Sequence, residues 1–448
     1  MPSARQELLS YLGQPNCYSL RPAVLEPLQL AAARELFAQR REQVQVLARR
    51  AQDCGVGSID QLDDLLPLLF SHTTYKSYPL SFIKQSQWER MTRWLATLSA
   101  VPVTGINLDG VVDVDDWVDR LWEAGHLVNT TSGTSGKVSF LNRTHGDDLL
   151  LRRCLEVGTC WPQPIKPDNS RHFFFFGPRS GPYLLVISSN QSAELFGRPD
   201  SLHYLSNERM KLTSITSAAE MRLKMADGTA TPDDIRQFDQ AATQQVKERK
   251  GRFDEMARRV IELRREPLFL AGAWPQIWDV VQQARAAGVG DGEFHPDTVI
   301  LSGGGAKGTS LPADFREVIM AFFGPVGTMQ AYGMSEMSRG FPLCEAGNYH
   351  QVPWIIPFVL DSEGAKSIGP REGRHEGRFA YLDLSNEARW NGLITGDRVT
   401  VDFSGHCNCG RDGLVVLPNI SRYANLGEED KIGCAGTIES YIRGSMAQ

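Results

Sequence analysis

The sequence predicts an α/β fold: a large multilayered domain built around a mostly parallel sheet. Between residues 125 and 340, strand-like apolar runs alternate with helix-like stretches, which is the pattern of parallel βαβ units. The first 100 residues contain mainly amphipathic helical patterns. The chain is 448 residues long and 42% hydrophobic, enough to support a full core.

The N-terminal region is predicted to be helical. Apolar residues recur at helical spacing from Leu25 to Ala51, with Arg and Gln between them, and again from Trp88 to Leu98. Such stripes are typical of helices packed on a core. We therefore expect residues 1–100 to form a mainly helical region against the main domain.

The middle of the chain is predicted to alternate strands and helices. Expected strands are Gly125–Asn129, Phe173–Phe176 ending at Gly177-Pro178, Tyr183–Ser188, Leu268–Gly272 and Thr298–Leu301. Expected helices lie in the polar stretch 206–265, facing solvent, and from Trp274 to Ala287.

Charge and composition exclude some classes of function. With 47 basic and 53 acidic residues the formal net charge is −6, which gives no reason to expect nucleic-acid binding. No run of about 18 apolar residues predicts a membrane helix, and the first residues lack the layout of a signal peptide. Eight cysteines are too few for a disulfide scaffold at this length. We expect a cytoplasmic enzyme.

A seven-residue segment is the most informative motif. It reads Thr131, Ser132, Gly133, Thr134, Ser135, Gly136, Lys137. Glycines let backbone N–H groups approach an anion, hydroxyls donate hydrogen bonds, and Lys adds a positive charge. The segment is not a Walker P-loop, because Thr131 stands where the first Gly belongs and Val138 follows the lysine. It therefore predicts either a phosphate cradle or an ordinary Ser/Gly-rich turn.

Three further segments follow in order. Gly303, Gly304 and Gly305 come after an apolar strand, then Tyr332-Gly333-Met334-Ser335-Glu336, then Thr395-Gly396-Asp397. Together the four segments resemble the adenylate-forming superfamily, over roughly residues 125 to 440. Cys407-Asn408-Cys409-Gly410-Arg411 resembles a late motif of its phenylacetate-CoA ligase branch.

The resemblance implies an AMP-forming ligase and assigns roles to individual residues. Ser132 to Lys137 would screen the ATP phosphates, with Lys137 counted as catalytic. Glu336 would contact Mg²⁺. Tyr332 would lie against the adenine, Gly303 to Gly305 would let the base approach the backbone, and Asp397 would bind both ribose hydroxyls. Without the resemblance, a turn-forming Asp is the simpler interpretation of Asp397.

Two close pairs of ligands predict a zinc site that does not depend on ATP. Cys344 and His350 are six residues apart, and Cys407 and Cys409 are two apart in a segment expected to be extended. The pairs also resemble those that bind zinc in some phenylacetate-CoA ligase relatives. His406 is a competing ligand. Four protein ligands predict a structural ion, against the alternative of unconnected thiols and imidazole.

The end of the sequence departs from the family pattern. The superfamily has a mobile C-terminal domain behind a Gly-Arg-x-x-Asp hinge, whereas only Ser421-Arg422-Tyr423 and Leu426 to Lys431 remain here. Arg422 is the candidate for the hinge arginine and is counted as catalytic; a surface Arg is the alternative. We expect residues 101–420 to form the adenylate-forming domain and 421–448 a truncated remnant, as in acyl-protein synthetases.

The substrates are less defined. By resemblance the acid is aromatic, with Phe173 to Phe176, Trp274 and Phe341 as candidate pocket residues. The acyl acceptor is CoA or another thiol, an amine, a hydroxyl or a protein. Alternatives are an ester- or amide-forming ligase without CoA, and a non-catalytic nucleotide-binding relative. No nucleic-acid or membrane partner is expected, and a homodimer is compatible with the sequence.

Overall fold

The computed structural model describes residues 2–131, 137–303, 309–426, 432 and 435–446. Packing contacts divide the chain into two units: Met1–Thr131, Ser139–Leu151 and Tyr332–Gln448 in the first, and Ser132–Val138 and Arg152–Ala331 in the second. In the described ranges no helix has the length and apolar character needed to cross a membrane.

A five-stranded parallel sheet forms the centre of the second unit, in the order β5-β4-β6-β7-β8. Its strands are β4 (Arg171–Ser180), β5 (Gly197–Arg209), β6 (Leu268–Ala273), β7 (Val299–Gly303) and β8 (Gly327–Met329). Its helices are α8 (Leu184–Phe196), α9 (Leu212–Ala226), α10 (Pro232–Glu262), α11 (Trp274–Ala286) and α12 (Phe315–Phe323).

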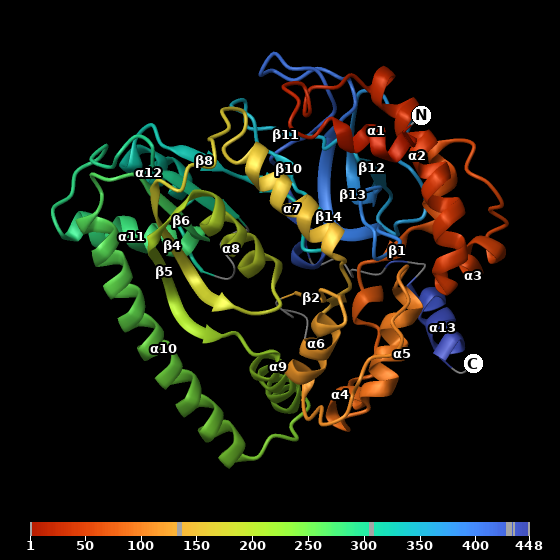
Figure 1. Cartoon of the computed structure of the whole chain (residues 1–448), viewed down its shortest axis with the longest axis horizontal. Coiled ribbons are helices and arrows are strands. Elements are labelled where there is room, and N and C mark those ends of the chain that lie inside the picture. The colour runs from red at the N-terminus through yellow and green to blue at the C-terminus, as the bar shows by residue number, and fades with distance from the viewer. Residues whose placement is uncertain (1, 132–136, 304–308, 427–431, 433–434, 447–448) are drawn as a thin grey trace. The chain divides into compact units, whose positions relative to one another are not determined.

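Helices cover both faces of this sheet. On one face Phe174, Leu270 and Ile300 join side chains of α10, α11 and α12 in one core cluster. On the other face Phe196 of α8 stacks on Phe269 of β6, with ring centroids 5.5 Å apart. The strands are therefore buried on both faces, which explains their uninterrupted apolar sequences. Figure 1 shows α10 running alongside β5.

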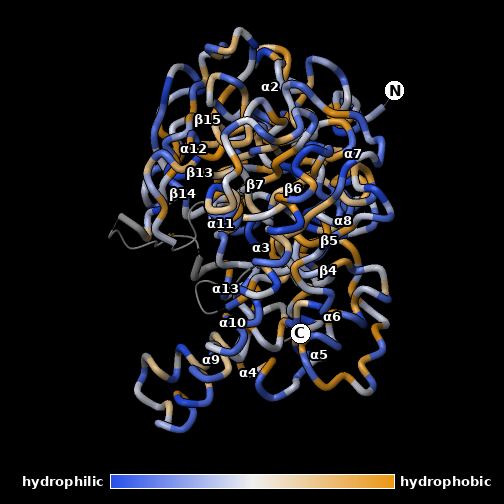
Figure 2. The backbone as a smooth tube through the Cα atoms, turned by 90° about the vertical axis from the view of Figure 1, so that its left-hand side faces the viewer, coloured by the Kyte–Doolittle hydropathy of each residue, from blue (hydrophilic) through white to orange (hydrophobic). Residues whose placement is uncertain are grey.

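Most predicted elements of the second unit are confirmed, and two are corrected. Tyr183–Ser188 is not a strand but the start of α8, because a short apolar run does not distinguish a buried strand from a buried helix. The strand of Phe173–Phe176 does not end at Gly177-Pro178 but continues to Ser180. Figure 2 shows mainly hydrophilic residues where α9 meets α10, as predicted for solvent-facing helices.

The first unit contains a larger sheet that the sequence did not predict. Seven strands pair in the order β11-β15-β14-β13-β12, with β1 and β16 also on β14. Every pairing is antiparallel except that of β1 with β14. The strands are β1 (Phe70–Ser71), β11 (Tyr349–His350), β12 (Ile355–Leu360), β13 (Arg374–Asp383), β14 (Gly392–Asp402), β15 (Val415–Val416) and β16 (Ser421–Arg422).

Two small sheets and a set of helices complete this unit. The small sheets pair β2 (Asn129–Thr130) with β3 (Phe140–Leu141), and β9 (Ala331–Tyr332) with β10 (Phe341–Pro342). The α-helices are α1 (Ala4–Ser10), α2 (Pro22–Gln43), α3 (Gln45–Asp53), α4 (Leu80–Lys84), α5 (Trp88–Leu98), α6 (Val114–Glu123) and α13 (Ala435–Met446). Short 3₁₀ helices are η1 (Leu62–Leu68), η2 (Thr74–Lys76) and η3 (Tyr423–Leu426), and α7 (His145–Gly158) begins here and ends in the second unit.

The N-terminal helices are as predicted, with one break. The stretch Leu25–Ala51 is not one helix but parts of α2 and α3, because Val44 is extended, with φ −108° and ψ 101°. The two units also differ from a division at residues 100 and 420. Strand β1 pairs with β14, and α13 packs on α3 and α5, so the first hundred residues and residues 435–446 share one unit.

Candidate functional site

Asp397 lies at an irregularity in the central strand of the larger sheet. Arg378 pairs with Arg398 and Ala380 with Ile394, so β14 advances four residues while β13 advances two. Such a bulge bends the strand and redirects a side chain. The backbone N–H of Asp397 donates to Thr395 Oγ1 at 3.1 Å, which fixes the local conformation. The alternative of an Asp in an ordinary turn does not describe this residue.

Two partners hold the Asp397 carboxylate. The phenol of Tyr332 donates to Oδ2 at 3.1 Å. Arg422 on β16 is paired directly opposite Asp397, and its Nε lies 3.2 Å from Oδ1. Burial and the Asp397 charge raise the pKa of Tyr332 well above its usual value, so the phenol stays protonated and donates. The structure thus brings together three residues singled out from the sequence.

Glu336 lies near the same group of charges. Burial raises the pKa of its carboxyl, while the positive charges of Arg389, Lys76 and Arg422 act in the opposite direction. The effect of burial is the larger, so the net shift of the Glu336 pKa is upward. Its backbone carbonyl is fixed by Arg389 Nη2 at 2.9 Å and by Asn391 Nδ2 at 2.8 Å.

Arg389 and Asn391 are positioning residues that the sequence did not reveal. The Arg389 side chain is buried, and its Nη1 also donates to the carbonyl of Asn142 at 3.2 Å. Asn391 continues the network to Asp383, whose Oδ2 accepts from the backbone N–H of Ser338 at 2.7 Å. The signal in the sequence was a polar run at 383–391, but nothing in it indicated burial.

Three other residues that were predicted to bind the nucleotide, Gly333, Ser335 and Thr131, make close contacts within the first unit. A Cβ on Gly333 would come within 2.7 Å of Gly340 Cα, so the backbone approaches too closely there for any side chain. The carbonyl of Ser335 accepts from Arg143 Nη2 at 3.3 Å. Thr131 Oγ1 accepts from the N–H of Ser139 at 3.2 Å.

The remaining nucleotide-binding predictions fall in the second unit or outside the described residues. Gly303 ends β7, where the sequence predicted a glycine turn after a strand, and Lys137 is described and half-buried. The structure does not describe the predicted residues Ser132, Gly133, Thr134, Ser135, Gly136, Gly304 and Gly305.

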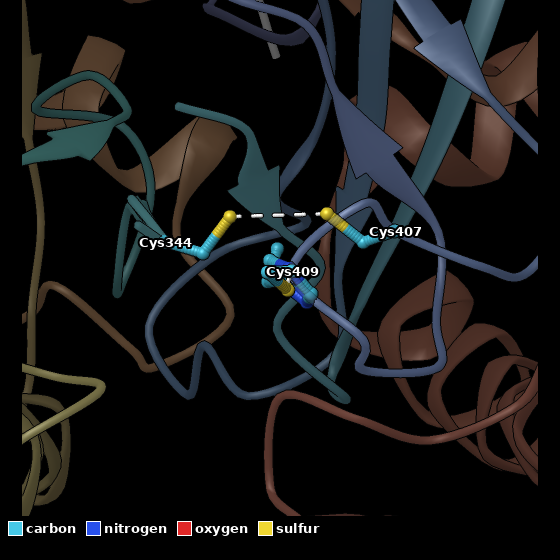
Figure 3. Close-up of side chains that lie close together, drawn as sticks. Cys344, Cys407 and Cys409 are labelled. Carbon is cyan, nitrogen blue, oxygen red and sulfur yellow. Dashed lines mark hydrogen bonds between the residues drawn. The ribbon is translucent and has the colours of Figure 1, made fainter. Parts of the chain in front are cut away.

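The four predicted metal ligands form one cluster in the first unit. The ligand atoms of Cys344, His350, Cys407 and Cys409 all lie within 4.8 Å of one another. Figure 3 shows the Cys344 and Cys407 sulfurs pointing toward each other, 3.8 Å apart. Cys409 Sγ lies 3.3 Å from His350 Nε2.

Turns present both cysteine segments. The N–H of Gly347 donates to the Cys344 carbonyl at 3.0 Å, and the N–H of Gly410 donates to the Cys407 carbonyl at 2.9 Å. Gly347 and Gly410 have φ of 77° and 83°, conformations that favour glycine. Cys407–Cys409 is therefore a turn and not the extended segment expected from alternation.

The His350 imidazole has the tautomer that a metal requires. Its Nδ1 lies 2.8 Å from the carbonyl of Tyr18, so Nδ1 carries the proton and Nε2 presents its lone pair to the cysteines. Burial lowers the pKa of His350, which favours the neutral ring. His406, the competing ligand, lies instead at the surface with Nδ1 2.8 Å from Asp412 Oδ1.

The cysteine cluster connects to the Asp397 group through one aromatic contact. Tyr349 immediately precedes His350, and its ring centroid is 6.1 Å from that of Tyr332. A backbone bridge between Tyr349 and Leu343 also joins the segment next to Cys344. Fixing the cluster therefore fixes the ring against which Tyr332 packs.

Comparison with known proteins shows the fold. No protein-family model matches the chain, and no curated protein matches it in sequence. An open conformation of 2-hydroxyisobutyryl-CoA ligase in complex with 2-HIB-AMP and CoA is similar, with a TM-score of 0.56 and 13% identity over 90% of this chain and 71% of the ligase. The same ligase in the postadenylation state with R3-HIB-AMP gives a TM-score of 0.56 and 12% identity over 91% and 69%. The chain thus shares the fold of this ligase, which confirms the predicted α/β fold class.

Proposed function

We propose that the protein is an ATP-dependent ligase that activates a carboxylic acid as acyl-AMP and releases pyrophosphate. The observation that carries this is the Asp397 carboxylate, held at a strand bulge by Tyr332 and Arg422. A carboxylate offers about four acceptor positions. Carboxylate oxygens accept hydrogen bonds from hydroxyl groups, so Asp397 would bind the two hydroxyls of a ribose, the role implied by the motif resemblance.

Glu336 would hold Mg²⁺ together with the substrate phosphates. A carboxylate is a hard oxygen ligand of the kind this ion prefers, and the fixed backbone of Glu336 keeps the side chain in place. The ion would neutralise phosphate charge. The roles of Lys137 and Gly303, which belong to the second unit, rest on the motif resemblance.

The cysteine cluster would hold a structural zinc ion. Three thiols and one imidazole nitrogen are the donor set that zinc takes in closed tetrahedral sites. Four protein ligands leave no position for a substrate, so the ion would stabilise the segments around Tyr349 and not take part in the reaction. The Tyr18 carbonyl is the outer partner that orients the ring of His350.

The acid and the acyl acceptor are the finer parts of the proposal. Phe173 to Phe176, Trp274 and Phe341 are each at most 2% exposed and serve as core, so they give no support for an aromatic pocket. The aromatic acid therefore rests on the branch resemblance alone. The acceptor would be CoA or another nucleophile.

ATP–pyrophosphate exchange over a panel of aromatic, hydroxy and aliphatic acids tests the proposal. Acid-dependent exchange is expected in the wild type, with strong loss in Asp397→Ala. ATP binding without exchange for any acid would instead support the non-catalytic relative. Mass spectrometry of products formed with CoA, amines or alcohols then distinguishes a CoA ligase from an ester- or amide-forming enzyme.

A further inference from the structure

A groove runs along strand β5 in the second unit, and of the residues singled out above only Phe174 lines it. Its volume is about 700 Å³. One wall is formed by all residues of β5 from Leu202 to Glu208 and the other by side chains of α10 between Arg252 and Glu262, and Phe174 of the neighbouring strand β4 also lines the space. The groove therefore lies between a strand and a helix over about three turns of that helix.

The strand wall of the groove is the open edge of the sheet. In the described chain β5 is the terminal strand, paired only with β4. Successive side chains of a strand point to opposite faces. Because seven consecutive residues line one space, that space runs along the strand edge, where backbone N–H and C=O groups are presented.

The pairing of β5 with β4 is irregular in three places. From Gly197 to Leu202, β5 advances five residues while β4 advances two, and this part contains Pro199. From Tyr204 to Ser206 the extra residue is in β4, and from Ser206 to Arg209 it is again in β5. Bulges, proline and lysine are the usual means by which proteins protect a sheet edge. Between Leu202 and Ser206, β5 has no extra residue, proline or lysine, so this part is suited to accept another strand.

The helix wall of the groove is complementary to itself in charge. Its charged residues are Arg252, Glu255, Arg258, Arg259 and Glu262. Four of these, Arg252, Glu255, Arg259 and Glu262, are spaced symmetrically about residue 257. If α10 of a second copy runs antiparallel along these four residues, each Arg lies opposite a Glu. If it runs parallel, like charges lie opposite each other. A two-fold interface uses one surface twice in opposite directions. A groove with balanced charges in this order fits a second copy better than a ligand of one sign.

The centres of the two walls lie together, as a single two-fold axis requires. Leu205 is the middle residue of 202–208, and Met256 lies near the middle of 252–262. Both line the groove and both belong to the same core cluster. The existing ion pair of Arg259 with Glu262, 2.9 Å long and half-exposed, is of a kind worth little and is no obstacle.

We propose that this groove is the interface between two copies of the chain, in which β5 pairs antiparallel with β5 of the second copy. The two sheets would then continue into one another across the axis. Arg252 would face Glu262 of the partner subunit, and Glu255 would face Arg259 of the partner subunit. The inference is independent of the proposed ligase activity.

Sedimentation equilibrium at low salt tests the interface by charge exchange. The wild type is expected to be a dimer. Arg252→Glu and Glu262→Arg each place like charges across the axis twice, and should weaken the dimer at least roughly 10-fold. The double variant restores opposite charges and should recover to within about 3-fold of wild type. The double variant also lacks the ion pair between Arg259 and Glu262 within one copy. Recovery of the dimer would therefore report on the contact between the two copies. Lys247→Glu, exposed on the same helix outside the groove, is the matched control and should have no effect.

Hydrogen exchange tests the strand pairing directly. Amides in residues 202–208 should exchange more slowly at concentrations where the dimer forms and faster on dilution, whereas the exposed residues 242–250 should not change. A chain that stays monomeric well above micromolar concentration would overturn the proposal. A dimer indifferent to both single variants, with unchanged exchange at 202–208, would overturn it as well.

Discussion

Tyr332 donates its phenol hydrogen to Asp397 over 3.1 Å, although 65 residues separate the two in the chain. Each belongs to a different short motif of the sequence, and the resemblance assigns them to different parts of one nucleotide. The contact shows that the two motifs meet within the first unit. It also makes the position of the Asp397 carboxylate depend on a residue that can be changed separately.

Asp397→Asn should raise the KM for ATP more than Tyr332→Phe does. The first change removes the charge that binds Arg422 and the proposed ribose, and hydrogen bonds to charged groups contribute about 1.5–3 kcal/mol. A loss of roughly 10- to 100-fold is expected in kcat/KM for ATP. The second change removes one hydrogen bond to the same carboxylate but keeps its charge and its contact with Arg422, so the loss should be smaller. If pyrophosphate exchange showed the same loss of kcat/KM for ATP in both variants, Asp397 would not contact the nucleotide.

Glu336→Gln should lower acyl-AMP formation by roughly 100-fold or more, because one strong electrostatic contact to the reacting phosphates is lost. Thermal stability should remain close to that of the wild type. Glu345→Gln is the matched control, since Glu345 pairs with Arg411 at the surface. Unchanged exchange in the Glu336 variant would remove this residue from the reaction.

Protein purified without added metal should contain close to one zinc per chain. The double variant Cys407→Ser, Cys409→Ser should lose the ion and much of its thermal stability, because binding energy at a structural site contributes to folding. Cys54→Ser is the control, since Cys54 is an exposed thiol outside the cluster. Atomic absorption and melting curves decide the question, and a metal-free wild type of equal stability would contradict it.

Gly333→Ala should reduce stability and activity together. The new methyl would meet Gly340 Cα at 2.7 Å, and overpacking of this kind costs about 1–3 kcal/mol. Gly251→Ala should have the opposite sign, because no atom lies within 4 Å of that position in α10 and Ala is the better helix former by up to about 1 kcal/mol. A Gly333 variant that melts like the wild type would show that the two segments can separate freely.

His126 should contribute to loss of stability in mild acid. It is buried, its Nδ1 lies 3.1 Å from the Asn142 amide, and burial lowers its pKa from the ordinary value. A lowered pKa means that the unfolded chain binds the proton first, so stability falls as pH drops below about 6.5. His126→Gln should make this dependence shallower by at most one proton. His172 and His203 in the second unit, whose pKa values are also lowered by burial, should retain their effects.

The sequence predicted the helices and strands that depend on the periodicity of nearby residues. The helix Trp88–Leu98, the strand and helix on either side of Ala273, and the strand before Gly303 follow from periodicity and appear as expected. The strand expected at Tyr183–Ser188 failed because an apolar run does not reveal whether its hydrogen bonds are made within the segment or to a neighbouring strand.

Contacts between residues far apart in the sequence were harder to predict. The spacing of the cysteines and histidine predicted a cluster, because two ligands that are close in sequence can bind the same ion. Arg389 gave no such signal, because it acts through the backbone carbonyl of Glu336, 53 residues away. The pairing of β1 with β14 was missed for the same reason, since Phe70 and Leu393 are far apart in the chain, whereas β12 to β15 pair with their neighbours in sequence.

Strand β14 pairs with strands from both ends of the chain, which has a consequence for synthesis on the ribosome. The partner strand β1 is translated before the second unit, whereas β14 to β16 are translated after it. The intervening second unit has a sheet of its own and can fold first, since domains fold as they emerge. The N-terminal helices must then wait with apolar surfaces exposed until β14 to β16 appear. During that interval the nascent chain should depend most on chaperones.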